Sequence, residues 1–94
     1  MEPVTIPIED ALDLHTFLPR DIPDLLEDYL TECLKAGLYS VRIIHGKGKR
    51  SEDGPRLKHM VRQVLREHSG VLAFTNSKPA NGGTGAVDVL LKSV

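Results

Sequence analysis

The sequence is short of several residues and patterns that mark particular classes of protein. It has one cysteine, Cys33, which can form neither an internal disulfide nor a cysteine pair that binds a metal. Its aromatic residues are two Phe and two Tyr, with no Trp, and they are too few for a surface on which successive bases stack. No apolar run reaches the roughly 20 residues of a membrane-spanning helix. These absences exclude a disulfide scaffold, a cysteine metal site, a stacking platform and a membrane span.

The length and composition fit an ordinary globular protein. The chain has 94 residues, enough for one domain with a modest core. The N-terminal residues do not show the basic start and apolar stretch of a signal peptide, so we expect a cytoplasmic protein. Cys33 stands at helical spacing from Leu30 and Leu34, which predicts a buried, small apolar side chain.

The charges are separated along the chain. The net charge of −1 argues against a strongly basic nucleic-acid domain. However, acidic residues dominate the segment 1–40, and basic residues dominate the segment 41–66. A local basic patch can bind anions whatever the total charge is.

The hydrophobic pattern predicts a β-α-β-α-β-β order within residues 8–94, after an extended lead-in over residues 1–7. We expect strands over about 11–15, 40–45, 71–75 and 86–91, and helices over about 21–37 and 54–70. Asp21 is the expected N-cap of the first helix, and Gly37 its C-terminal stop. Right-handed crossovers place both helices on the same face. The predicted fold is a two-layer α/β (α+β) sandwich with a mixed four-stranded sheet.

Candidate catalytic residues stand at the expected ends of the first two strands. In Leu12-Asp13-Leu14-His15, alternation along a strand places Asp13 and His15 on the same side. His45 follows the second strand. In open sheets with parallel strands, ligands bind beyond the carboxyl ends of the strands. The two imidazoles are suited to proton transfer. Asp13 could orient an imidazole, hold a divalent cation such as magnesium, or simply pin the adjacent turn.

Two glycine-bearing segments are candidate phosphate binders. One follows the second strand, and the other precedes the last strand. Their candidate residues are Gly46, Lys47, Gly48, Lys49, Arg50, Gly82, Gly83 and Gly85. The spacing matches neither a Walker A loop nor a dinucleotide fingerprint, and no pair of residues has the spacing of a structural metal site.

A basic stripe on the second helix has two interpretations. Lys58, Arg62 and Arg66 recur every four residues, a spacing at which like charges repel each other. The stripe either binds an anion or pairs with the acidic stripe of the first helix, which consists of Asp24, Asp28 and Glu32. The sequence favours neither. His59 and His68 are given no catalytic role, and Phe17, beside His15, is the best candidate to touch a base.

Together, the motifs resemble those of the Smr (small MutS-related) domain family, in a stand-alone form. The resemblance lies in Leu12-Asp13-Leu14-His15, His45-Gly46-Lys47-Gly48 and Gly82-Gly83-Thr84-Gly85-Ala86, in that order. One departure is Thr16, which stands where the first motif usually has glycine. The resemblance implies a fold similar to that of the C-terminal domain of translation initiation factor three.

The resemblance also implies a function. Some members of the family nick DNA or cleave RNA, and others are nucleic-acid-binding modules. We therefore expect DNA or RNA as the partner and nuclease chemistry at Asp13, His15 and His45, with no residues assigned as metal ligands. A non-catalytic nucleic-acid-binding module and a protein-interaction domain are the alternatives. The sequence does not distinguish DNA from RNA.

Overall fold

A computed structural model of the protein describes residues 7–46, 54–78 and 85–92. The strands are β1 (Asp10–Asp13), β2 (Ser40–Ile44), β3 (Val71–Asn76) and β4 (Ala86–Leu91). The helices are α1 (Ile22–Lys35) and α2 (Gly54–Glu67), and a short 3-10 helix, η1 (Pro19–Asp21), precedes α1. The order of helices and strands is the predicted one.

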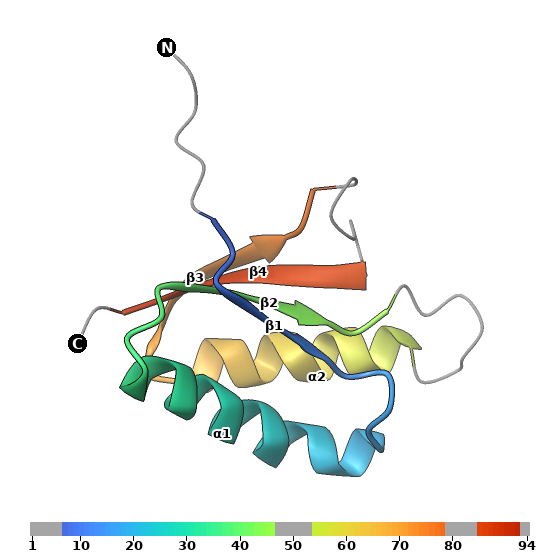
Figure 1. The fold of residues 1–94 in the computed structure, drawn as a ribbon. Helices are drawn as coiled ribbons and strands as arrows, with labels where there is room; N and C mark the ends of the chain where they lie inside the picture. Colours follow the sequence, from blue (N-terminus) through green and yellow to red (C-terminus); the bar gives the residue numbers. More distant parts are fainter. Residues whose placement is uncertain (1–6, 47–53, 79–84, 93–94) are drawn as a thin grey trace.

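The four strands form one mixed sheet in the order β1-β2-β4-β3. β1 is parallel to β2, and β4 is antiparallel to both β2 and β3. The strands β1, β2 and β3 therefore run in the same direction, and β4 starts where they end. We call this region the carboxyl end of the sheet; it lies on the right in Figure 1. Both helices cover the same face (Figure 1), which confirms the predicted two-layer sandwich.

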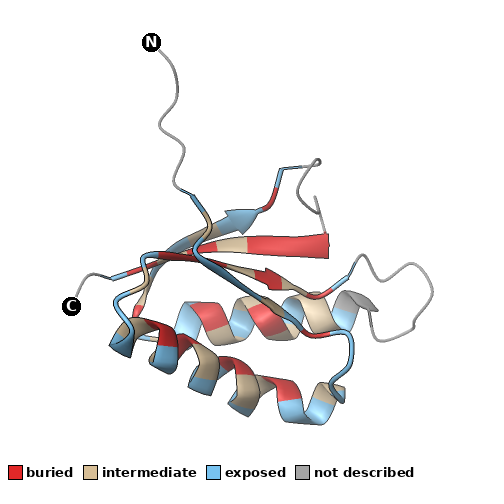
Figure 2. Ribbon diagram, in the orientation of Figure 1, coloured by how far each residue is buried: buried red, intermediate tan, exposed pale blue. Residues whose placement is uncertain are grey.

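The core lies between the helices and the sheet, and Figure 2 shows the buried residues on the sides of α1 and α2 that face the strands. Helix α1 buries Ile22, Leu26, Leu30 and Cys33, which recur at helical spacing. The burial of Cys33 confirms its prediction as a small core residue. Partly buried Tyr29 donates its hydroxyl to Asp10 Oδ2 at 2.6 Å, so α1 is also held to β1 at the rim of the core.

The ends of α1 agree with the sequence at one terminus and differ at the other. Gly37 has φ +77°, a value that favours glycine. The N–H groups of Gly37 and Leu38 bond the carbonyls of Leu34 and Cys33, which is a Schellman motif. Asp21, the expected N-cap, makes no capping hydrogen bond with its side chain. Its helical backbone continues from η1, whereas a capping side chain needs extended backbone to fold back.

The open face of the sheet carries an ion pair between neighbouring strands. Arg42 on β2 lies opposite Asp88 on β4, with Nε 2.7 Å from Oδ1 and the second nitrogen 3.3 Å from Oδ2. The Ser77 hydroxyl also donates to Asp88 Oδ1 at 2.6 Å. Partial burial alone would raise the pKa of Asp88, but these hydrogen bonds outweigh it and lower that pKa. The pair fixes the register of β2 and β4 on the side away from the helices.

We predict that Leu30→Ala destabilises the protein by about 2–5 kcal/mol, the usual cost of truncating a buried leucine. Leu30 is fully buried between α1 and the sheet. The matched control is Leu72→Ala, since Leu72 is 65% exposed, and it should change the free energy of unfolding by no more than about 0.5 kcal/mol. Urea unfolding measures both. Equal effects of the two substitutions would contradict the placement of the core.

Candidate active site

Backbone hydrogen bonds bring the described parts of the three motif segments together at the carboxyl end of the sheet. The Leu14 N–H donates to the carbonyl of Ile44 at 2.9 Å, which places the end of β1 beside the end of β2. The N–H groups of His45 and Gly46 both donate to the carbonyl of Gly85, at 3.0 and 2.9 Å. Lys47, Gly48, Lys49, Arg50, Gly82 and Gly83 lie outside the described residues.

Asp13 and His15 form a close pair just after β1. One carboxylate oxygen, Asp13 Oδ1, accepts the backbone N–H of His15 at 3.0 Å and lies 2.6 Å from its ring Nδ1. These bonds, the backbone one first, lower the pKa of the Asp13 carboxyl. A carboxylate can only accept, so Nδ1 carries a proton and Nε2 is the free ring nitrogen. The His15 side chain is 71% exposed, so a substrate can reach it.

The strand predicted to reach His15 ends at Asp13 instead. The reason is the Asp13 side chain, which takes the N–H of His15, while the N–H of Phe17 turns back to the carbonyl of Leu14 at 3.1 Å. The chain therefore leaves the sheet in a turn. Asp13 is hydrogen-bonded both to the backbone of this turn and to the imidazole, which fits two of the three roles that the sequence left open for it. Thr16 in the turn is exposed and does not have positive φ, so the backbone there does not require the family's usual glycine.

His45 occupies a different environment, although it lies on the neighbouring strand end. Only 5% of it is exposed. Its ring Nδ1 lies 2.8 Å from the carbonyl oxygen of Gly46, so this nitrogen is the donor and Nε2 carries the lone pair of the neutral ring. Burial lowers the pKa of His45, and the charges of Lys58 and Arg62 lower it further, against the effect of the Gly46 bond. The ring is neutral at neutral pH.

Gly46 and Gly85 serve the backbone at this position. Gly46 has φ +84°, where a side chain would be strained, and its conformation sends its carbonyl to the His45 ring. Its N–H is taken by Gly85. Gly46 was predicted to bind phosphate. In this conformation its N–H is not available to a phosphate, because the carbonyl of Gly85 accepts it. Both glycines therefore accept hydrogen bonds that fix the backbone and the ring of His45.

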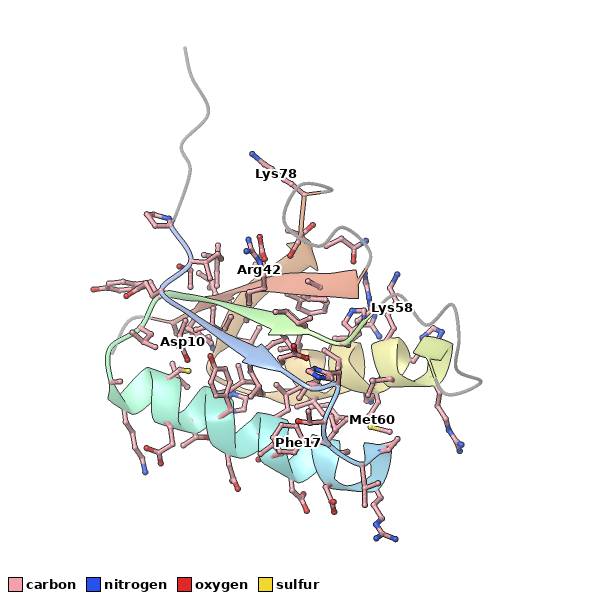
Figure 3. All side chains as sticks on the ribbon, turned by 45° about the vertical axis from the view of Figure 1, so that its right-hand side comes forward. Asp10, Phe17, Arg42, Lys58, Met60 and Lys78 are labelled. Atoms are coloured by element: carbon pink, nitrogen blue, oxygen red, sulfur yellow. The ribbon has the colours of Figure 1, made fainter. Side chains whose placement is uncertain are left out.

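The structure also places two cations beside His45 that were not among the predicted site residues. Lys58 and Arg62 belong to α2. Figure 3 shows Lys58 near the end of β2 and the start of β4. The Arg62 guanidinium donates to Asn76 Oδ1 at 2.6 Å and lies 6.0 Å from the centroid of the Phe74 ring. Their spacing of four residues was a signal in the sequence. It did not reveal that the stripe faces the end of β2.

The alternative of ion pairing between the two helices is wrong. In the described part of the chain, no salt bridge joins Asp24, Asp28 or Glu32 to Lys58, Arg62 or Arg66. Glu32 instead pairs with Lys35 on its own helix at 3.6 Å. Arg62 instead donates to Asn76 on β3 at 2.6 Å.

The remaining sequence expectations concern a metal ion, Phe17 and a membrane span. Within residues 7–46, 54–78 and 85–92, no group of three or more His, Cys, Asp or Glu side chains could hold a metal ion. Both hydrogen bonds between Asp13 and His15 use the Oδ1 oxygen of the carboxylate, and a bound divalent cation stays a prediction. Phe17 is 40% exposed and follows His15 by two residues; its contact with a base stays a prediction. None of the described helices is long and apolar enough to cross a membrane.

Comparison with known proteins gives a consistent result. Residues 12–92 match the family model for the Smr domain. The chain is 38% identical over 81 residues to endonuclease MutS2 of Geobacillus kaustophilus, covering 86% of this chain and 10% of that protein. It is 33% identical over 89 residues to endonuclease MutS2 of Thermomicrobium roseum, covering 94% and 11%. The chain thus spans about a tenth of the length of these relatives.

Solved structures agree with the fold. The Smr domain of Thermus thermophilus MutS2 superimposes with a TM-score of 0.78 at 28% identity, covering 88% of this chain and 98% of that one. YdaL from Escherichia coli, a stand-alone small MutS-related protein, superimposes with a TM-score of 0.80 at 29% identity, covering 88% and 64%.

The geometry of the Asp13–His15 pair predicts a tautomer. In alkaline solution, where a histidine ring is neutral, His15 should carry its proton on Nδ1, because the Asp13 carboxylate only accepts. Asp13→Ala should remove this preference. Ring ¹⁵N chemical shifts measure it, and exposed His59 on α2 is the internal control that should not change. A His15 ring that carries its proton on Nε2 in the wild type would contradict the pair.

Proposed function

Because the chain belongs to the Smr domain family, we propose that it binds nucleic acid and acts as an endonuclease that cleaves phosphodiester bonds of DNA or RNA. The observation that carries the proposal is the exposed His15 ring, which the Asp13 carboxylate holds at 2.6 Å. Relatives named endonuclease MutS2 share this family, which supports the proposed chemistry.

In the proposed mechanism His15 transfers the proton. Its Nδ1–H is held by Asp13, so Nε2 faces solvent in a fixed orientation and can take a proton from the attacking hydroxyl or, when protonated, give one to the leaving oxygen. Asp13 also stabilises the imidazolium that forms during the reaction. A fixed ring loses less orientational freedom when the substrate arrives. These are the contributions expected from an orienting carboxylate and a general acid or base.

We assign His45 a positioning role in this mechanism. Its ring is buried and neutral, and it donates to the Gly46 carbonyl. It therefore holds the backbone next to Leu14 and His15 and need not touch the scissile phosphate. Among the predicted catalytic residues, the described structure leaves His15 as the exposed imidazole. Lys47, Lys49 and Arg50 remain proposed contacts to the nucleic-acid backbone.

The second candidate function is a nucleic-acid-binding module without catalysis. The burial of His45 favours it, because only one exposed imidazole is then available where cleavage of a phosphodiester usually needs both an acid and a base. The two functions differ in one measurable outcome, the cleavage of nucleic acid by the wild-type protein. Both require binding.

We predict that His15→Ala lowers the cleavage rate by about 10²–10⁴-fold, the usual contribution of a general acid or base. Substrates are supercoiled plasmid and structured RNA, each with magnesium and with EDTA. Affinity should change little, because a single neutral imidazole contributes modestly to phosphate binding. The control is His59→Ala, which removes an exposed histidine on α2.

Three outcomes separate the hypotheses. Loss of cleavage with His15→Ala, but not with His59→Ala, supports the nuclease. Binding without any cleavage in the wild type supports the binding module, and Thr16→Gly then asks whether the exposed threonine side chain beside His15 restrains the site. Wild-type cleavage that survives His15→Ala undiminished would show that another residue transfers the proton.

A further inference from the structure

We propose that Lys58 and Arg62 on α2, with the buried ring of His45 behind them, form a binding subsite for a backbone phosphate of the nucleic acid. This subsite is separate from the Asp13–His15 pair and is built from residues that the proposed mechanism leaves without a substrate contact. It rests on the proposed function for the identity of its ligand. The contacts of each residue support it in turn.

The Arg62 guanidinium is only partly satisfied. One terminal nitrogen donates to Asn76 Oδ1 at 2.6 Å, and the group lies 6.0 Å from the centroid of the Phe74 ring. These contacts fix its orientation against β3. Its Nε is buried and has no hydrogen-bond partner among the described residues. A buried donor without a partner is costly, and a fixed guanidinium with spare donors fits a phosphate oxygen well.

His45 contributes a second unsatisfied atom. Its Nε2 is buried and also lacks a partner in the described part of the chain, while its Nδ1 is occupied by Gly46 at 2.8 Å. The residue is only 5% exposed. Nε2 is thus the one ring atom left to receive or donate a hydrogen bond. A phosphate oxygen would accept from this nitrogen once the ring is protonated.

The charges around this ring favour an anion. Lys58 and Arg62 are close enough to His45 to disfavour its protonated form. Neither cation has a carboxylate within salt-bridge distance among the described residues. The backbone N–H of His45 donates to the carbonyl of Gly85, and the N–H of Leu14 donates to the carbonyl of the preceding residue, Ile44; neither Gly85 nor Leu14 carries a charge. The single negative charge of a backbone phosphate would offset part of this positive charge and favour a proton on His45.

The alternative is a purely structural role, in which Arg62 fastens α2 to β3 through Asn76. That role explains one nitrogen of the guanidinium. It does not account for the unpartnered Nε of Arg62, the unpartnered Nε2 of His45 or the nearby Lys58. The proposal explains all three with one ligand, and it gives the basic stripe of α2 a function that ion pairing between the helices does not provide.

The test is an NMR titration of the His45 ring in the whole protein, with inorganic phosphate as the first probe and a short single-stranded oligonucleotide as the second. Chloride at matched ionic strength is the control. Bound phosphate should raise the pKa of His45, because a nearby negative charge favours the protonated ring. Lys58→Met should abolish the rise caused by phosphate, because it removes one of the two cations that bind the anion. The variant should still fold, because Lys58 makes no salt bridge to another described residue.

Arg62→Met and Arg66→Met form a matched pair on the same stripe. Arg62→Met should weaken oligonucleotide binding roughly tenfold and make the salt dependence of binding shallower by about one counterion. Arg66, one turn further along α2, is exposed, and Arg66→Met should have a smaller effect. A dispersed amide spectrum confirms that each variant is folded.

The outcomes separate this subsite from the proposed function. An oligonucleotide that binds while the His45 ring and its pKa do not respond to either probe would overturn the subsite and leave nucleic-acid binding intact. A His45 response to inorganic phosphate without any oligonucleotide binding would support an anion site and count against the proposed function. Equal effects of Arg62→Met and Arg66→Met would reduce the subsite to general charge attraction and overturn it.

Discussion

Two backbone hydrogen bonds, from the N–H groups of His45 and Gly46 to the carbonyl of Gly85, join the end of β2 to the start of β4. The rest of the site depends on them. They extend the β2–β4 ladder beyond Ile44, at the end of the sheet where β1, β2 and β3 finish and β4 begins. They also turn Gly46 into its φ of +84°, which sends a carbonyl to the His45 ring. On the other side of β2, the bond from Leu14 to Ile44 places Asp13 and His15 at the same end.

The two motif histidines differ in environment more than in position. Each donates its Nδ1–H to a neighbouring oxygen, the carboxylate of Asp13 for His15 and the carbonyl of Gly46 for His45. His15 is exposed, whereas burial and two nearby cations keep His45 neutral. This difference suits the exposed ring of His15 to proton exchange with a substrate. It suits the buried ring of His45 to fixing the backbone and, in the proposed subsite, to binding a phosphate.

Much of the fold was predictable because its signals are local or follow from handedness. The apolar stripe of α1, the stop at Gly37 and the right-handed crossovers each depend on nearby residues or general sterics. The details of the site depend on contacts that the sequence does not display. The strand stops at Asp13 because of a side-chain bond to His15. His45 is buried beside Gly85, which is 40 residues away in the sequence. The orientation of Arg62 depends on Asn76, which is 14 residues away.

The central claim is that the carboxyl end of the sheet is the surface that contacts nucleic acid. Amide chemical-shift mapping with a non-cleavable single-stranded oligonucleotide tests it most directly. The account predicts the largest shifts at His15, Gly46 and Gly85, which surround this end. Shifts concentrated instead at Tyr39 and Leu72, which lie with Pro7 and Leu91 at the opposite end of the strands, would contradict it.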